Sequence, residues 1–379
     1  MAHLIPITNT PRDYAWGAVD GVAGALGWAP TGAPEAELWL GAHPLSPSRR
    51  VGTGDWQDLT EWEAHSGRTL PYLLKVLAAA SPLSLQAHPT PEQAASGFAR
   101  EEAAGVPLTA RERNYKDPHA KPELIVAVDD GFEALCGFRP VAETLALIDA
   151  LTAASDTPEA LASWRAATAA GVREAFEWLL SGAADGAVAA AVATAQAHPA
   201  DFELIDRLAR AYPGDPGILV AQMLNPVTLA AGQSLWLPAG NIHAYLRGTG
   251  VELMGPSDNV LRGGLTPKHI DRDELAKVLD FTPGPPSRLQ PAPLGSNVVS
   301  YRPASVESGA GVGFELLAVT GDATFAVDSA AIAVVLEGAF TLSAGGAEAA
   351  ADRGAILFVD AAAELNAAGS GRLFVATGV

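Results

Sequence analysis

The sequence predicts a mainly β protein that is interrupted by one helical segment, and three observations support this fold class. The 379 residues include 38 Gly and 28 Pro, which indicate many turns. Short apolar runs bounded by turn residues, such as "KPELIVAV" and "GILVAQML", predict strands before residue 139 and after residue 213. Between them, "VAETLALIDALTAA" and "DFELIDRLARAYP" carry apolar residues at helical spacing.

These changes between strand-like and helix-like residue patterns along the chain predict three domains. Residues 1–138 and 214–282 form a discontinuous β domain that we expect to carry the functional site, and residues 139–213 form an inserted domain of three or four helices. The Pro-rich stretch "FTPGPPSRLQPAPLG" at 281–295 is typical of a linker. Residues 283–379 then form a small C-terminal β domain.

Composition limits the partners and the compartment. A net charge of −19 argues against nucleic acid and against anionic membranes, so a small anionic ligand would need a local group of Lys and Arg side chains. The single cysteine, Cys136, excludes an intrachain disulfide and a thiolate metal cluster, which fits a reducing compartment. We find no signal peptide pattern and no apolar run of membrane-spanning length, so the sequence predicts a cytoplasmic protein.

The stretch "GQSLWLPAGNIH" fits the second motif of the cupin barrel, G-x5-P-x-G-x2-H. Gly and Pro shape the turns, and His243 then lies on the following strand, facing the interior of a barrel whose mouth suits a divalent metal. The usual Asn four residues later is Arg247 here. A lone strand histidine is more often a hydrogen-bonded core residue than a metal ligand, so the motif alone leaves both interpretations open.

A weak echo of this motif occurs near the C-terminus, in "GAILFVDAAAEL" from Gly354. Asp360, Ala362 and Leu365 stand at the offsets of Pro238, Gly240 and His243. If this run is a degenerate copy, the chain holds two cupin barrels and the C-terminal one lacks metal ligands. Chance is the alternative, because short strand–turn–strand units recur often.

Two further stretches carry side chains that can bind a metal. In "LSLQAHPT", Gln86 and His88 stand at i and i+2 and share one face of a strand. Glu123 follows Pro122 at the head of an apolar strand, where a carboxylate must be paired, protonated or metal-bound. The alternatives are a Gln amide satisfied by backbone groups and a Lys121–Glu123 pair at a strand end.

The stretch "GVELMGPSDNVLRGGLTPKHID" is the most polar in the chain. It could be plain surface, but Arg262 and Lys268 lie among glycines, and small residues let an anion such as phosphate approach closely.

Together, "AELWLGAHP", "LPYLLKVL", "PLSLQAHP", "KPE", "LPAGNIHAYLRG" and "PSDNVLRGGLTPKHID" resemble the type I mannose-6-phosphate isomerase (phosphomannose isomerase) family of the cupin superfamily. The resemblance runs in order from residue 14 to about residue 272. It implies a zinc enzyme that interconverts mannose 6-phosphate and fructose 6-phosphate through an enediol. It implies one Zn²⁺ per chain, held by Gln86, His88, Glu123 and His243, and an active-site arginine at Arg262. The positions that match the family's substrate pocket are Lys75, Ser84, Lys121, Glu252, Asp258 and Lys268. One departure is His119–Ala120 before "KPE", where the family usually has Asn-His, and the other is Arg247.

For catalysis we expect Lys121 or Glu252 to move the proton between C2 and C1, with Arg262 stabilising the phosphate or the enediolate charge. Lys268, Lys75 and Ser84 are expected to help bind the phosphate. We expect a monomer that binds a small sugar phosphate and neither nucleic acid nor membrane. The rival interpretations are another metal-dependent cupin enzyme, such as a different sugar-phosphate isomerase or an oxygenase, and a non-catalytic protein that binds sugar phosphate.

Overall fold

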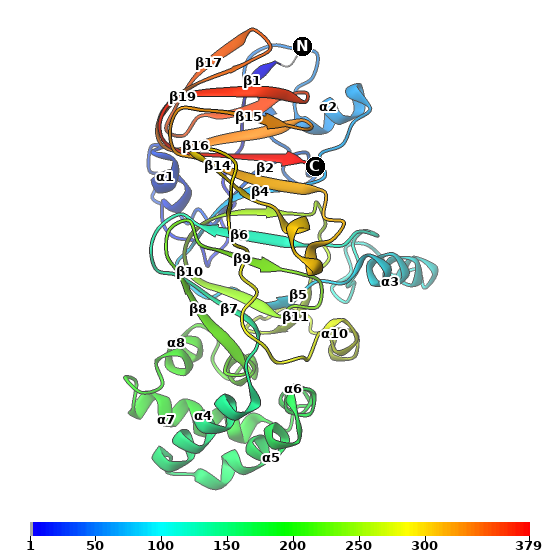
Figure 1. Ribbon diagram of the computed structural model, residues 1–379. Helices are drawn as coiled ribbons and strands as arrows, with labels where there is room; N and C mark the ends of the chain where they lie inside the picture. The colour runs from blue at the N-terminus through cyan, green and yellow to red at the C-terminus, as the bar shows by residue number, and fades with distance from the viewer. Residues whose placement is uncertain (1–2) are drawn as a thin grey trace.

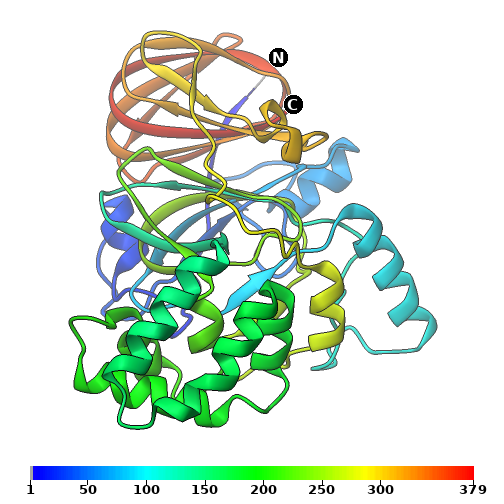
Figure 2. The same ribbon diagram turned by 60° about the horizontal axis from the view of Figure 1, so that its bottom comes forward.

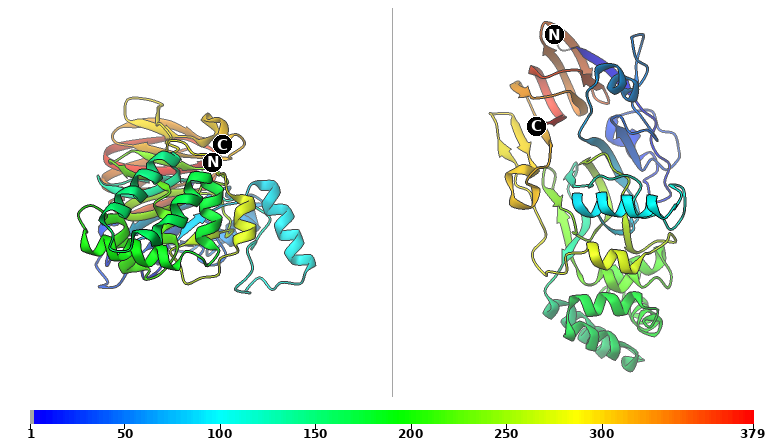
Figure 3. Two further views of the ribbon diagram at one scale, coloured as in Figure 1. Left: turned by 90° about the horizontal axis from the view of Figure 1, so that it is seen from below. Right: turned by 90° about the vertical axis from the view of Figure 1, so that its right-hand side faces the viewer.

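The computed structural model describes residues 3–379, which form two antiparallel sheets and a cluster of helices arranged along one long axis (Figure 1). A nine-stranded sheet lies between a ten-stranded sheet at one end and the helices at the other, as the side view also shows (Figure 3). The predicted class, mainly β with helices between β regions, is therefore confirmed.

The nine-stranded sheet contains β2 (Glu37–Leu40), β4 (Leu73–Ala79), β5 (Leu85–Ala87), β6 (Glu123–Ala127), β7 (Phe132–Phe138), β8 (Leu224–Leu229), β9 (Ser234–Leu237), β10 (His243–Met254) and β11 (Leu261–Gly264). The ten-stranded sheet contains β1 (Leu4–Thr8), β3 (Arg49–Arg50), β12 (Ala292–Pro293), β13 (Val298–Tyr301), β14 (Phe314–Val319), β15 (Ala323–Val327), β16 (Ala331–Ala344), β17 (Ala347–Asp352), β18 (Ile356–Val359) and β19 (Ala363–Gly378). The helices are α1 (Gly21–Leu26), α2 (Leu59–Ser66), α3 (Pro91–Ala103), α4 (Val141–Ala154), α5 (Ala162–Ala170), α6 (Val172–Leu180), α7 (Asp185–Ala197), α8 (Glu203–Ala211), α9 (Gly217–Ala221) and α10 (Arg272–Val278), with 3₁₀ turns at Pro158–Leu161, Pro303–Ser305 and Glu307–Gly309.

Strand β10 organises the nine-stranded sheet because it pairs with four other strands. Its first half pairs with β5 and β7, and its second half pairs with β4 and β6. Gly248 lies where the two halves meet, with a φ of 119°, and a Cβ there would come within 2.9 Å of Phe132. Only glycine fits this position without strain. Just before it, the register of β10 against β7 shifts between Tyr245 and Arg247, which changes the alternation of side chains and lets one strand carry residues of the site at both ends.

Helices α4 to α8 cover the end of the nine-stranded sheet (Figure 2). Their apolar faces bury Trp164, Phe176 and Leu179 in one cluster that continues under the sheet through Leu135 and Ile242. No single helix within residues 3–379 is long and apolar enough to cross a membrane, although α6 and α7, bent by 97° to each other, pass that test by length and composition as a pair.

The structure corrects one predicted strand and places the first strand, β1, in the ten-stranded sheet. The run "GILVAQML" was predicted as a strand, but its first five residues, "GILVA", form the short helix α9, and all five are buried. Pro216 precedes it, and a short apolar run without alternation fits a buried helix as well as a strand. At the other end of the molecule, β1 pairs with β18 and so lies in the ten-stranded sheet. The domain boundaries at 138, 213 and 282 stay a prediction.

One ion-pair group ties the helices to the sheet. Glu133 in β7 lies 2.5 Å from Arg207 of α8 and 2.5 Å from Arg247 of β10, the residue that departs from the cupin motif. Burial would raise the pKa of Glu133, but the two arginines lower it below its ordinary value of 4.5.

Replacing this carboxylate gives a pH-dependent stability prediction. Because the folded pKa lies below the unfolded one, the stabilisation is present above the unfolded pKa and is lost as pH falls through the folded pKa. Glu133→Gln should therefore reduce the free energy of unfolding by about 1 kcal/mol at pH 7. In urea titrations the difference from the parent chain should narrow below pH 4.5, whereas Glu348→Gln on the exposed surface of β17 should change little. A difference that stays constant down to pH 3 would contradict the assignment.

Candidate metal centre and active site

Three side chains from separate stretches of the chain converge inside the nine-stranded sheet. His88 follows β5, Glu123 opens β6 and His243 opens β10, and each is 1% exposed. Nε2 of His88 lies 3.3 Å from Oε2 of Glu123, and Nε2 of His243 lies 3.0 Å from the same oxygen. One possible ligand atom from each residue lies within 4.8 Å of the others. The sheet thus brings together three of the four residues expected to bind the metal.

The hydrogen bonds behind the two histidines decide what their Nε2 atoms can do. Nδ1 of His88 lies 2.7 Å from the carbonyl of Asn259, and Nδ1 of His243 lies 3.0 Å from the carbonyl of Asn241. A carbonyl only accepts, so each Nδ1 carries the ring proton and each Nε2 presents a lone pair. Burial lowers the pKa of His88 to about 4, which keeps that ring neutral at neutral pH.

The resulting arrangement fits a cation. Two nitrogen lone pairs and the carboxylate oxygen Oε2 of Glu123 face one another, and none of these atoms has a hydrogen-bond partner among residues 3–379. Such a buried set is repulsive unless a positive ion lies between its members. Imidazole nitrogen and carboxylate oxygen are ligands of zinc, and backbone acceptors behind the histidines are the usual way to fix their orientation.

Gln86 lies beside this group. It stands in β5, opposite His243 in β10 and opposite Arg262 in β11. It is partly exposed and lines a cavity of about 400 Å³, which we call the site cavity. Glu123 also lines the site cavity, whereas His88 and His243 lie behind it.

The site cavity brings the other expected residues together. Among the side chains that line it are all those predicted for catalysis or substrate binding: Lys75, Ser84, Lys121, Glu252, Asp258, Arg262 and Lys268. Aromatic residues complete its wall, namely Tyr14, Trp16, Trp39, Tyr212 and Tyr245. A polar cavity of this size, bordered by side chains that can hold a metal ion, suits a small polar ligand.

Buried charges are paired at one side of the site cavity. Nζ of Lys75 lies 2.9 Å from Glu252 and 3.5 Å from Glu37, and the hydroxyl of Tyr245 donates to Glu252 at 2.9 Å. Burial alone would lower the pKa of Lys75, but the charges of Glu252 and Glu37 raise it above its ordinary value. Burial raises the pKa of Glu252, against the opposing charge of Lys75. Nζ of Lys121 lies 2.7 Å from Oε1 of Glu123, so one lysine neutralises the side of that carboxylate turned away from the histidines.

Sequence reasoning missed Glu37 and Tyr245. A signal for Tyr245 was present, since it lies two residues after His243 and therefore on the same face of β10. Glu37 pairs with Lys75 across two strands, and that contact requires the register of β2 against β4, which no local pattern reveals.

Two cations without carboxylate partners border the site cavity. Arg262 lies in β11 and Lys268 in the loop that follows it, and neither forms an ion pair within residues 3–379. Burial lowers the pKa of Arg262, and burial together with the charge of Arg262 lowers the pKa of Lys268. Neighbouring cations that lack counter-charges favour an anionic ligand.

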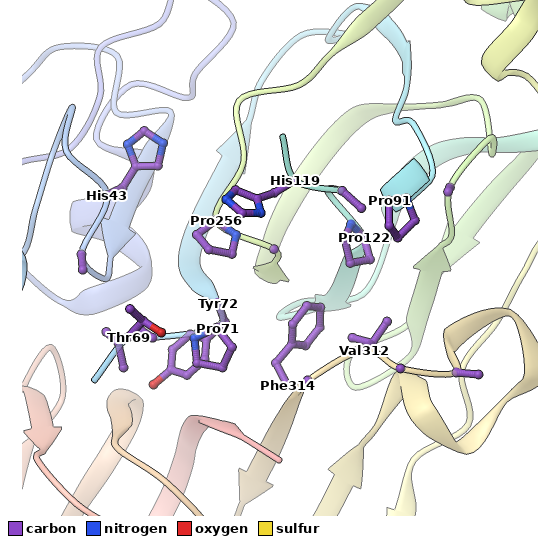
Figure 4. A pocket seen from close by; sticks show the side chains of 18 of the residues that line it. His43, Thr69, Pro71, Tyr72, Pro91, His119, Pro122, Pro256, Val312 and Phe314 are labelled. Carbon is purple, nitrogen blue, oxygen red and sulfur yellow. The ribbon is translucent and has the colours of Figure 1, made fainter. Parts of the chain in front are cut away.

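A second cavity, of about 680 Å³, is larger but holds none of these groups. Its lining is mostly apolar, with five prolines (Pro44, Pro71, Pro91, Pro122 and Pro256) and a few polar residues such as His43, Glu63 and His119, and we call it the proline-lined cavity. Figure 4 shows His43 on one side of it and Phe314 and Val312 on the other. The chemistry of the side chains, rather than cavity size, identifies the smaller cavity as the candidate active site.

Comparisons with known proteins agree with this geometry. The model of the family "Phosphomannose isomerase type I, catalytic domain" matches residues 4–141. The mannose-6-phosphate isomerase of Salmonella typhimurium is 36% identical over 97% of both chains, and that of Escherichia coli is 35% identical over 97% of both. Among solved structures, mannose 6-phosphate isomerase from Salmonella typhimurium bound to fructose 6-phosphate and zinc superposes with a TM-score of 0.85 at 32% identity, covering 99% of both chains.

Removing a lone pair or the charge from the three-residue group should abolish metal binding. We expect the parent chain to retain about one zinc ion after dialysis, and His243→Ala or Glu123→Gln to bind zinc about 100-fold more weakly or worse. Zinc should raise the melting temperature of the parent chain but not that of the variants, because only the folded parent binds it. His65→Ala, an exposed histidine on α2, is the matched control. Equal zinc content in all four proteins would rule out this metal centre.

Proposed function

This chain belongs to the type I phosphomannose isomerase family, and on that premise we propose that it interconverts mannose 6-phosphate and fructose 6-phosphate with zinc as cofactor. The observation that carries the proposal is the adjacency of two features. His88, Glu123 and His243 form a buried group that fits a metal ion, and this group borders the site cavity. The same cavity is bordered by Arg262 and Lys268, which form no ion pair within residues 3–379.

We assign four residues to the metal: Gln86, His88, Glu123 and His243. The first is supported by its position opposite His243, and the other three by their unpartnered ligand atoms. When bound, zinc supplies a Lewis acid that can polarise an oxygen of the sugar and stabilise negative charge that develops on it.

The cationic side of the site cavity suits the phosphate. Arg262 and Lys268 have no carboxylate partners within the described part of the chain, so a phosphate group can take that place with charge-assisted hydrogen bonds. Lys75 and Ser84, which we also assign to substrate binding, line the same cavity. Lys75 is already paired with two carboxylates, so its hydrogen bonds to a substrate would be shared with them.

The reaction moves a proton between C2 and C1 through an enediol, and this requires a group that can take up and return a proton on one side of the sugar. Glu252 and Lys121 are the candidates. Burial raises the pKa of Glu252, which makes this carboxylate a better proton acceptor than an exposed one. Lys121 lies against Glu123, which places its Nζ beside the metal group.

At the level of the fold, we propose two cupin barrels, with the catalytic one in residues 1–138 and 214–282, the helical insertion in 139–213 and a degenerate barrel in 283–379. Support comes from Leu365, which stands at the offset of His243 and is fully buried in the apolar cluster of the second sheet. We also propose a cytoplasmic monomer that binds zinc and a small sugar phosphate but neither nucleic acid nor membrane, in line with its net charge of −19.

The function is tested by coupling turnover to zinc content. The zinc-loaded chain should convert mannose 6-phosphate to fructose 6-phosphate, and removing zinc with a chelator should abolish this until zinc is restored. Full turnover in a sample verified to be free of metal would contradict the cofactor assignment. Absence of turnover in the zinc-loaded chain would contradict the function.

Arg262→Ala should lower kcat/KM by about 100-fold or more, because the substrate loses a buried cation that stabilises its charge. Zinc content should stay at the level of the parent chain. Arg165→Ala, which removes an exposed arginine paired with Asp149 on the helical insertion, is the matched control and should leave turnover unchanged. Loss of zinc in the Arg262 variant would show that the arginine supports the metal group instead.

A further inference from the structure

His43 lies outside the site cavity but touches a residue that lines it. It follows β2 in the stretch "GAHP", is 5% exposed, and lines the proline-lined cavity (Figure 4). Its Nε2 lies 3.3 Å from Oδ1 of Asp258, which lines the site cavity. His43 itself lines only the proline-lined cavity of the two, so it can influence a ligand in the site cavity only through neighbours that line that cavity, and among these Asp258 is the one that carries a charge.

The proton of the His43 ring can be placed from its neighbours. The backbone N–H of Leu45 donates to Nδ1 at 3.3 Å, so Nδ1 must present a lone pair. In an imidazole whose Nδ1 accepts, the proton is on Nε2, the atom that faces Asp258. Trp39 packs against the ring edge-to-face, with centroids 4.8 Å apart and planes at 77°, and so holds the ring plane. His43 thus presents its Nε2 proton on the side of Asp258, whose Oδ1 lies 3.3 Å away.

Asp258 has few other restraints. Its backbone N–H donates to Asp117 at 2.9 Å, which fixes the main chain, but His43 is the one side chain within ion-pair distance of its carboxylate among residues 3–379. The carboxylate is 39% exposed toward the site cavity. Burial would raise the pKa of Asp258, but the contact with His43 and the nearby lysines lower it, so the group is an anion at neutral pH.

We propose that His43 is a positioning residue of the isomerase: its Nε2–H holds Oδ1 of Asp258 and leaves Oδ2 to accept from a hydroxyl of the bound sugar. This inference rests on the proposed function, in which Asp258 contacts the substrate. The role differs from that of the metal-binding histidines, whose Nε2 atoms carry no proton. Along the chain, "GAHP" and "SDN" are more than 200 residues apart, and only the fold joins them.

The test compares two substitutions that differ in the donor alone. His43→Phe keeps a ring against Trp39 but has no N–H, whereas His43→Gln can place an amide donor near the position of Nε2. In zinc-loaded protein, H43F should lower kcat/KM by about 10- to 100-fold, the effect of losing a hydrogen bond to a charged group. H43Q should recover most of that loss. Zinc content and melting temperature should match the parent in both, and His65→Phe on α2 is the matched control.

A second measurement does not depend on turnover. ¹⁵N spectra of the histidine rings should show His43 protonated at Nε2 alone, and its ring signals should move in Asp258→Asn. Three results would overturn the proposal. The first is a kcat/KM of H43F within about 2-fold of the parent, which is less than the loss of a hydrogen bond to a charged group causes. The others are a kcat/KM of H43Q as low as that of H43F, and a ring proton on Nδ1 of His43. If the parent chain shows no isomerase activity, the proposed function fails by itself, and the ¹⁵N spectra still decide the His43–Asp258 contact.

Discussion

The arrangement of the metal centre and the sheet around it depends on one contact, in which the buried carboxylate of Glu123 faces the Nε2 lone pairs of His88 and His243. An ionised carboxylate that is 1% exposed loses its hydration, which costs several kcal/mol unless opposite charge replaces the water. Lys121 meets that need at Oε1 of Glu123, 2.7 Å away. Oε2 of Glu123 faces Nε2 of His88 and Nε2 of His243. Backbone carbonyls hold the ring protons of both histidines on Nδ1, so neither Nε2 can donate a hydrogen bond to Oε2. A metal ion resolves this conflict, so the polar centre of the sheet and the metal depend on each other.

The sheet delivers these groups through β10, which carries His243 at its start and Glu252 near its end. Because side chains alternate across a strand, a slip of one residue against β5 or β4 would turn both away from the site. The first half of β10 pairs His243 with Gln86 and the second half pairs Glu252 with Lys75, with a register shift against β7 between the two halves. The strand therefore places the metal group and the Lys75–Glu252 pair along the wall of a single cavity.

Local patterns predicted some parts of this arrangement and could not predict others. Turn-rich composition and helical spacing were enough for the mainly β class and for the helices after residue 140, because both signals are local in the chain. The alternation in "QAHP" predicted a shared face for Gln86 and His88, and the Pro before Glu123 marked a carboxylate at a strand head. The pairing of Glu37 with Lys75, the place of β1 in the second sheet, and the contact of His43 with Asp258 depend on register between distant segments. Arg247 was recognised only as a departure from a motif. Its partner Glu133 lies on another strand, β7, and also binds Arg207 of the helical segment.

The charge distribution reconciles a net charge of −19 with an anionic ligand. Surface charges more than about 8 Å away are largely screened at physiological ionic strength, so the carboxylates elsewhere on the protein count for little inside the site cavity. What matters there is that burial lowers the pKa values of Arg262 and Lys268, which means that both cations are partly desolvated and destabilised as charges. In the proposed function, a phosphate would supply the missing opposite charge in a place where water is already partly excluded. The free energy lost by keeping these two cations without a carboxylate partner among residues 3–379 would then be recovered on binding, and this would make the site selective for an anion.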